Sequence, residues 1–324
     1  MLSSDLAQNV LAVTPRILGL ADRSTQSSTF GCCERYYWKY KLHDYPNARF
    51  QEAALLLAML QTTSFEGNIY KDKRKVAEWA IGMCDFWLQR RNRDGSCLEM
   101  YPNERSFCAT TFSTWSICQA LNILSRGEAA EEVDNFISKV GFAAEIEKTG
   151  QWIIKNMHYG VSNQAAAAAV SLQSISPFTG KSSYSDEARK IVDRLFESDG
   201  ADGRFQEYDG FDLGYATITL SCLAWYAELA GRTAEFRSRF YDVCENLGAF
   251  IDDSGRYDSS VMSRGTKYLF PHVFTVSDHP VADKIAHGLE TNSILSPMWM
   301  DDRYCVGLAI DYMKSLRHLL TKEK

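Results

Sequence analysis

The sequence predicts an all-α protein in which about six helical hairpins form a closed (α/α) toroid. Residues 45–50 (YPNARF) and 101–107 (YPNERSF) nearly repeat each other 56 positions apart, and each precedes an apolar stretch. An Asp-Gly turn at residues 94–95 recurs at 202–203 and, as Asp-Ser-Gly, at 253–255. A period of about 54 residues divides the 324-residue chain into six units, each of them one supersecondary element.

Apolar residues recur at helical spacing through most of the chain, whereas strand-like alternation is scarce. The helical stretches cover residues 53–60, 107–124, 164–175, 215–229, 236–251 and 305–320. Turns that contain Gly, Asp and Asn separate many of them, for example at residues 93–96, 198–204 and 252–256. We therefore expect antiparallel helix pairs in a single domain that spans residues 1–324 and has no β-sandwich.

Paired helices of this kind build either an open solenoid or a closed toroid. An open solenoid needs polar capping repeats at its ends. The loops before alternate helices of this chain are instead long, aromatic and rich in Asn, Arg and Glu. This favours a closed ring whose inner helices begin at one face, where their loops converge to form a cleft.

Composition and charge argue against several classes of protein. The net charge is −6 and no Lys/Arg-rich block stands out, which disfavours nucleic acid or an anionic membrane as a partner. No apolar run reaches 18 residues, so we expect no membrane span. The N-terminus has no secretory pattern, and the nine cysteines contain no CxxC pair, which together predict a cytoplasmic protein. The 12% aromatic content suits a deep core and also a sugar-stacking cleft.

The strongest candidate site is the loop of residues 202–215 (DGRFQEYDGFDLGY), which contains four acids and leads into an apolar helix. Helix capping explains Asp212 well, but it does not explain Glu207, Tyr208 or Tyr215. We predict that Tyr215 and Glu207 are catalytic and that Tyr208 and Asp212 bind substrate.

A second candidate is the segment of residues 155–164 (KNMHYGVSNQ), which is followed by five alanines. The alanines permit the close packing expected of an inner helix. Asn163 would open that helix, either as an ordinary N-cap or as a site residue. His158 is either a half-buried loop residue or a catalytic one. We predict a catalytic role for both.

A third loop, residues 99–106, offers Tyr101, Asn103, Glu104 and Arg105 as substrate-binding residues. Glu104 and Arg105 could instead form a surface ion pair, which would contribute little to stability. The repeat has alanine where Glu104 stands, which favours a site role for this glutamate.

A fourth loop, residues 263–272 (SRGTKYLFPH), places Arg264 and His272 among aromatic residues, as an anionic or polyhydroxylated ligand would require. The alternative is an ordered loop that closes the ring. The sequence contains no GxGxxG, GxxxxGK[ST], HExxH or GxSxG motif and no His/Cys set with zinc spacing. We therefore expect neither a metal nor another cofactor.

Asn163-Gln164 at the start of an Ala-rich helix, the DG…E loop, and Tyr215 at the start of the next inner helix resemble heparinase II/III-type polysaccharide lyases. The match is to the α/α toroid of that family and covers about residues 90–270; the 52 positions between Asn163 and Tyr215 fit one repeat. The chain is also similar to toroid proteins encoded among polysaccharide-assembly genes. Two departures are Gln164, where the family often has His, and the lack of a C-terminal β-sandwich that carries a further catalytic His; His158 or His272 could replace it.

This resemblance implies β-elimination on a uronate-containing polysaccharide or oligosaccharide, without a metal. Asn163, with Arg105 or Arg264, would neutralise the developing enediolate. Tyr215 would take the C5 proton or protonate the leaving oxygen.

Three other classes remain open. An inverting glycoside hydrolase needs two carboxylates about 6.5–9.5 Å apart. Glu99 or Glu104 could pair with Glu207 or Asp212 for this purpose. A non-catalytic carbohydrate-binding or scaffold protein is another alternative. A terpene-cyclase-like toroid is disfavoured by the polar loops and by the absence of a DxDD motif.

Overall fold

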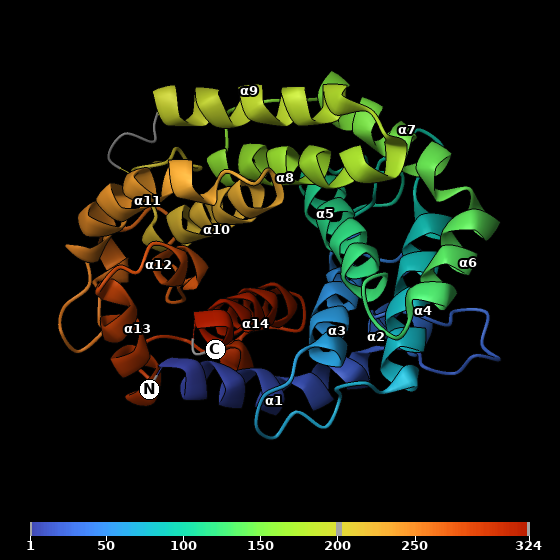
Figure 1. Ribbon diagram of the computed structural model, residues 1–324, viewed down its shortest axis with the longest axis horizontal. Coiled ribbons are helices and arrows are strands. Elements are labelled where there is room, and N and C mark those ends of the chain that lie inside the picture. Colours follow the sequence, from blue (N-terminus) through green and yellow to red (C-terminus); the bar gives the residue numbers. More distant parts are fainter. Residues whose placement is uncertain (1, 199–202, 323–324) are drawn as a thin grey trace.

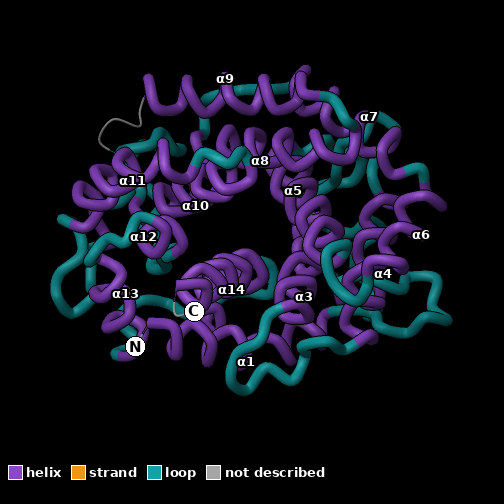
Figure 2. Tube along the Cα trace, in the orientation of Figure 1, coloured by secondary structure: helices purple, strands orange, loops and turns teal. Residues whose placement is uncertain are grey.

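The computed structural model describes residues 2–198 and 203–322, and Asp202 of the predicted Asp-Gly repeat lies outside these ranges. Within them, the chain folds into fourteen α-helices and three short 3₁₀ helices, and it has no β-strand. The all-α prediction is therefore confirmed. Loops connect the helices throughout (Figure 2).

Six helices lie nearest the centre of the molecule in Figure 1, and each contacts the next along the chain. They are α3 (Ala53–Thr62), α5 (Phe107–Leu124), α8 (Ser162–Thr179), α10 (Leu213–Leu229), α12 (His272–Val276) and α14 (Tyr304–Lys322). The last of them, α14, packs against both α12 and α3. Helices α3, α5, α8 and α10 are buried on nearly all faces, which explains their almost unbroken small and apolar sequences. The five alanines of α8, for example, are fully buried.

The outer helices pack around this inner set (Figure 1). They are α1 (Leu2–Leu20), α4 (Arg74–Arg90), α6 (Ala130–Val140), α7 (Phe142–Lys155), α9 (Ser182–Ser198), α11 (Thr233–Gly248) and α13 (Val281–Glu290). Helix α4 contacts α3, α9 contacts α8, α11 contacts α10, α13 contacts α12, and α1 contacts α14. The short elements are α2 (Arg35–Trp38), η1 (Ala48–Glu52), η2 (Ser259–Val261) and η3 (Pro297–Trp299).

All six predicted helical stretches are helical, with shifts of a few residues at their ends. The predicted stretch 236–251 corresponds to α11, which ends at Gly248. Helix α8 begins at Ser162 with Val161 in the N-cap position, so Asn163 lies in the first turn and does not cap the helix. Asp212 caps α10 as expected, because its Oδ1 accepts a hydrogen bond of 3.1 Å from the Tyr215 amide.

The repeated Asp-Gly turns have a shared structural cause. Gly95, Gly203 and Gly255 all have positive φ, at 88°, 79° and 77°. At each glycine an added Cβ would come within 2.5 Å of an atom of an outer helix, namely α7, α11 or α13. Glycine is required there both for its left-handed conformation and for the close approach of the outer helix.

We expect Gly255→Ala to destabilise the protein by roughly 3 kcal/mol, through left-handed strain and overpacking together. An added Cβ would lie 2.5 Å from Gly288 Cα and from the Lys284 carbonyl oxygen, both of which are backbone atoms. Gly180→Ala is the matched control, because Gly180 has a φ of 67° but no neighbour within 4 Å of an added Cβ. Denaturant unfolding of both variants measures the difference. Equal losses would contradict the role of close helix approach.

Candidate active site

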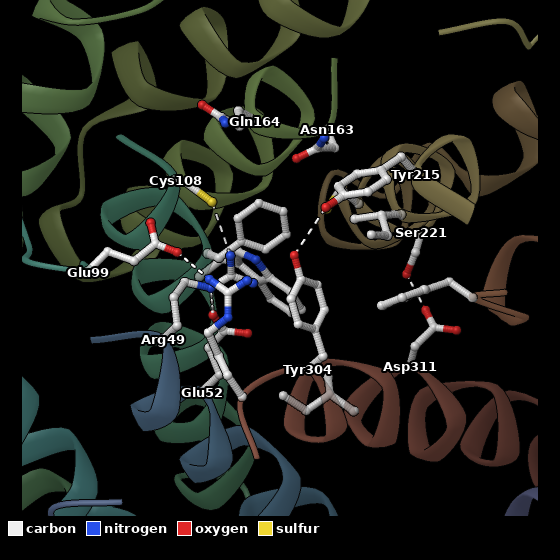
Figure 3. Close-up of a pocket in the computed structure, with 18 of the residues that line it drawn as sticks. Arg49, Glu52, Glu99, Cys108, Asn163, Gln164, Tyr215, Ser221, Tyr304 and Asp311 are labelled. Carbon is white, nitrogen blue, oxygen red and sulfur yellow. Dashed lines mark hydrogen bonds and ion pairs between the residues drawn. The ribbon is translucent and has the colours of Figure 1, made fainter. Parts of the chain in front are cut away.

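A cavity of about 250 Å³ is lined by residues from α5, α8, α10, α14 and η1 and from the loops that precede α5, α10, α12 and α14 (Figure 3). Seven of its lining residues are aromatic and five are charged. The aromatic lining residues are Phe112, Trp115, Tyr208, Tyr215, Trp225, Phe270 and Tyr304, and the charged ones are Arg49, Glu52, Glu99, Arg303 and Asp311. Aromatic faces with a few convergent polar groups are typical of small-molecule and sugar sites.

Two tyrosines meet in this cavity. The hydroxyl oxygens of Tyr215, at the start of α10, and Tyr304, at the start of α14, lie 3.1 Å apart and share a hydrogen bond. In Figure 3 the two hydroxyls point toward each other. Burial and the neighbouring Tyr304 raise the pKa of Tyr215 well above its ordinary value. Tyr215 therefore keeps its proton at neutral pH, and its hydroxyl can donate a hydrogen bond to an oxygen atom of a bound ligand.

Asn163 lines the same cavity, and a buried carboxyl group orients its side chain. Its Nδ2 donates a hydrogen bond of 2.6 Å to Glu207 Oε2, and its backbone N–H lies 3.3 Å from Glu207 Oε1. Burial raises the pKa of Glu207 to about 7, although the hydrogen bonds from Asn163 oppose this shift. Glu207 is thus a positioning residue behind Asn163. The neighbouring Gln164 and Tyr208 also line the cavity, and their side chains lie 3.4 Å apart.

The floor of the cavity holds two arginines, each paired with a glutamate. Arg49 forms an ion pair with Glu52, donates a hydrogen bond of 3.0 Å to Cys108 Sγ, and lies 4.1 Å above the ring of Phe112. Arg303 forms an ion pair with Glu99, and its guanidinium lies 4.3 Å from the centre of the Tyr304 ring. Partly buried arginines of this kind bind the carboxylate of a ligand well, because their forked donors match its two oxygens.

Asp311 contributes a third carboxyl group to the wall. It lies on α14, where its Oδ1 accepts a hydrogen bond from the Ser221 hydroxyl and its Oδ2 accepts one of 3.0 Å from the His272 amide. Burial raises the pKa of Asp311 to about 7, although both hydrogen bonds oppose the shift. A carboxyl group that titrates near neutral pH can act as an acid or as a base.

Of the residues considered in the 99–106 loop, Glu99 lines the cavity, whereas the four predicted to bind substrate, Tyr101, Asn103, Glu104 and Arg105, do not. Tyr101 is 69% exposed, and Asn103 occupies a left-handed turn with a φ of 60°. Glu104 Oε2 accepts hydrogen bonds from the amides of residues 99, 100 and 101, and Arg105 pairs with Asp94 on the surface. Glu104 and Arg105 therefore hold the loop together and do not pair with each other.

The other predicted residues lie around the cavity. The guanidinium of Arg264 lies 5.6 Å from the ring centres of both Tyr208 and Tyr215, so it sits at the edge of the site. Asp212 braces the loop that carries Arg264, because its Oδ2 accepts hydrogen bonds from the amides of Arg264 and Thr266.

The two predicted histidines lie outside the cavity lining. His272 is fully buried beside Glu228, with 3.3 Å between His272 Nε2 and Glu228 Oε1. Burial lowers the pKa of His272 to about 4, so its ring is neutral at physiological pH. His158 packs against Phe107, with 4.5 Å between ring centres, and burial lowers its pKa as well.

Sequence reasoning did not assign the cavity residues Arg49, Glu52, Arg303, Tyr304 and Asp311 to the site. Arg49 was visible as the arginine of the YPNARF repeat, and its burial distinguishes it from the exposed Arg105 at the equivalent position. The other cavity residues carry no local motif. Of these, Arg303, Tyr304 and Asp311 reach the site because α14 packs against α3, and Glu52 lies directly before α3.

No protein-family model, curated protein or solved structure matches the chain. The resemblance to the heparinase II/III-type lyases therefore stays a prediction. Among residues 2–198 and 203–322, no helix is long and apolar enough to cross a membrane. Within the same ranges, no cluster of three or more His, Cys, Asp or Glu side chains is arranged to hold a metal ion.

The raised pKa of Glu207 predicts a specific pH dependence of stability. Glu207 binds its proton more tightly in the folded protein than in the unfolded chain. Its contribution to the free energy of unfolding is therefore complete below about pH 4.5 and is lost as pH rises through about 7. A pKa difference of this size between the folded and unfolded states corresponds to roughly 3 kcal/mol in the free energy of unfolding. Glu207→Gln removes the titration, so its stability relative to wild type should improve between pH 4.5 and 8, as measured by urea unfolding.

Glu66→Gln provides the control, since it makes the same chemical change at an exposed glutamate. A Glu207→Gln variant whose stability relative to wild type stays constant from pH 4.5 to 8 would refute a perturbed Glu207.

Proposed function

We propose that the helices form an (α/α) toroid of six hairpins and that the cavity at the N-terminal ends of α5, α8, α10 and α14 binds a carbohydrate. The unbroken series of contacts from α3 to α14 and back to α3 supports this arrangement. So does the outer partner of each inner helix, of which α4 on α3 and α9 on α8 are examples.

The reaction that we propose is β-elimination on a uronate-containing polysaccharide. The observation that carries it is that Asn163 and Tyr215, from two different helices, line one cavity next to Tyr304. Seven aromatic side chains in the same wall offer flat apolar faces to sugar rings. The arginines of the floor, although each is paired with a glutamate, offer guanidinium N–H donors to the uronate carboxylate.

Elimination breaks the C5–H and C4–O4 bonds of the uronate and forms a C4=C5 double bond. The C5 proton passes to a base, and a second proton reaches the leaving O4. Tyr215 is the acid in this proposal, because its protonated hydroxyl lies in the cavity beside Tyr304 and can donate to the leaving oxygen. Asp311 is the base, since its pKa of about 7 leaves a substantial fraction as a basic carboxylate at neutral pH. Asn163 and Arg303 stabilise the negative charge that develops on the carboxylate during the reaction.

A panel of uronate polysaccharides (alginate, pectate, hyaluronan and heparosan) tests this proposal by the ultraviolet absorbance of unsaturated uronyl ends. We expect Tyr215→Phe to reduce the rate by about 10²–10⁴-fold, because a positioned acid contributes a factor of this order. Tyr241→Phe is the control, because Tyr241 lies on α11 and is half-exposed outside the cavity lining. An unsaturated product that forms equally fast with Tyr215→Phe would overturn the role of this tyrosine.

An inverting glycoside hydrolase is the second candidate, and the raised pKa of Asp311 is the observation that favours it. Of the four carboxyl groups considered from the sequence, Glu99 lines the cavity, whereas Glu104, Glu207 and Asp212 do not. A hydrolase would therefore use Asp311 as the acid and Glu99 as the base.

The products distinguish the two reactions. A hydrolase releases reducing ends without ultraviolet absorbance, and Asp311→Asn and Glu99→Gln would each abolish that release while Tyr215→Phe would not. Unsaturated ends that depend on Tyr215 exclude the hydrolase. Glycan binding with neither product would identify a carbohydrate receptor.

A further inference from the structure

A row of aromatic rings leads along the surface to the cavity. Tyr40 and Tyr36 lie with ring centres 6.2 Å apart, Tyr36 and His43 lie 6.0 Å apart, and His43 stacks on Tyr45 at 6.0 Å. Tyr36 and Tyr40 are 44% and 53% exposed, and His43 is also exposed. Exposed aromatic groups that are contiguous in this way mark binding surfaces more often than isolated ones do.

The row is continuous with the cavity. The Tyr45 hydroxyl donates a hydrogen bond to the Met100 carbonyl oxygen, and both Met100 and the adjacent Glu99 line the cavity. A polymer that extends beyond the cavity past Met100 would therefore meet Tyr45 and then the other rings.

Buried hydrogen bonds hold the row in place. The buried Glu34 carboxylate lies 3.1 Å from His43 Nδ1 through one oxygen and accepts a hydrogen bond of 2.6 Å from the Asn47 amide through the other. Trp38 Nε1 donates a hydrogen bond of 2.7 Å to the Leu20 carbonyl oxygen. A pre-organised row of this kind loses little conformational entropy when it binds a ligand.

The row also carries positive charge in a chain whose net charge is −6. Residues 35–43 (RYYWKYKLH) include Arg35, Lys39 and Lys41, and the acids that flank them are the buried Glu34 and the exposed Asp44. Lys39 and Lys41 are exposed, and the Arg35 guanidinium lies 5.3 Å from the centre of the Tyr40 ring. Cations interleaved with aromatic rings fit a polyanion that has flat apolar faces.

We propose that Tyr40, Tyr36 and His43 form a binding track for the sugar units of an anionic polysaccharide that lie outside the cavity. The inference rests on the proposed function of the cavity and extends it, since it makes the substrate a long polymer and not a short oligosaccharide. Single-stranded nucleic acid has the same charge and also stacks on aromatic rings. The glycan is favoured because the row leads to the aromatic cavity.

The test compares binding of tetrasaccharide and dodecasaccharide fragments of alginate, pectate, hyaluronan and heparosan by isothermal titration calorimetry. Tyr215→Phe is the background for all measurements, so that the fragments are not cleaved. We expect the best-bound dodecasaccharide to bind at least tenfold more tightly than its tetrasaccharide, because the additional units occupy a linked second site. Tyr36→Ala with Tyr40→Ala should remove this advantage and leave tetrasaccharide binding unchanged. A double variant, Lys39→Gln with Lys41→Gln, should weaken the binding of the dodecasaccharide but not of the tetrasaccharide. This loss of affinity should be smaller at high salt, because salt screens the charges.

Tyr241→Ala is the matched control, because it removes a half-exposed tyrosine from a different part of the surface. The proposed track is contradicted if the protein binds the tetrasaccharide and the dodecasaccharide with equal affinity. It is also contradicted if the variant with Tyr36→Ala and Tyr40→Ala still binds the dodecasaccharide more tightly. Tighter binding of a dT12 oligonucleotide than of every glycan also overturns it. Dodecasaccharide binding that needs Tyr36 and Tyr40 but is unaffected by Trp115→Phe and Trp225→Phe in the cavity would retain the track and reject the proposed function of the cavity.

Discussion

Helix α14 occupies the space between α3 and α12, and the site depends on this placement. The helix also packs against α1, so that elements from the two ends of the chain lie side by side (Figure 1). Two ion pairs fix the loop that precedes it: Arg16 with Asp302, at 2.6 Å, and Arg303 with Glu99, 204 positions away in sequence. The helix then brings Tyr304 and Asp311 to face residues of α5, α8 and α10. Without this contact the cavity would lack one wall.

The charges inside the cavity are better explained by function than by stability. Burying an ion pair costs desolvation energy that its attraction seldom exceeds, and apolar replacements are often as stable. Burial raises the pKa of Glu52 even though Arg49 lies beside it, whereas the attraction of Glu52 raises the pKa of Arg49 in spite of burial. Behind the wall, burial alone would raise the pKa of Glu228, but His272 and Lys314 outweigh it and hold that pKa below its ordinary value. Such arrangements are typical of sites that bind or transform a polar ligand.

The local features of the fold were predictable from the sequence. The spacing of apolar residues correctly predicted six helices, because a helix that is buried on one or more faces carries a recognisable apolar pattern. These helices are α3, α5, α8, α10, α11 and α14. The Asp-Gly repeat correctly identified equivalent turns, since Gly95 and Gly255 meet the same steric requirement. The YPN repeat was less informative: Asn47 is extended and buried whereas Asn103 is left-handed and exposed, so similar residues have different roles.

The site was only partly predictable, for a physical reason. Asn163 and Tyr215, which line the cavity, were singled out in the sequence because each lies at the start of a helix with a clear apolar pattern. Arg49, Arg303, Tyr304 and Asp311 were not assigned to it, because their roles depend on the long-range packing of α14, which no local pattern encodes. Glu104 was predicted to bind substrate, and its three hydrogen bonds to backbone amides give it a structural role that a sequence pattern cannot reveal.

A crystal structure of the Tyr215→Phe variant with bound alginate, pectate, hyaluronan or heparosan tetrasaccharide would show whether the cavity binds sugar. We expect a sugar ring stacked against the aromatic residues between residue 215 and Tyr304, with its carboxylate within hydrogen-bonding distance of Asn163 or Arg303. A tetrasaccharide bound elsewhere on the protein while the cavity stays free of sugar would contradict it.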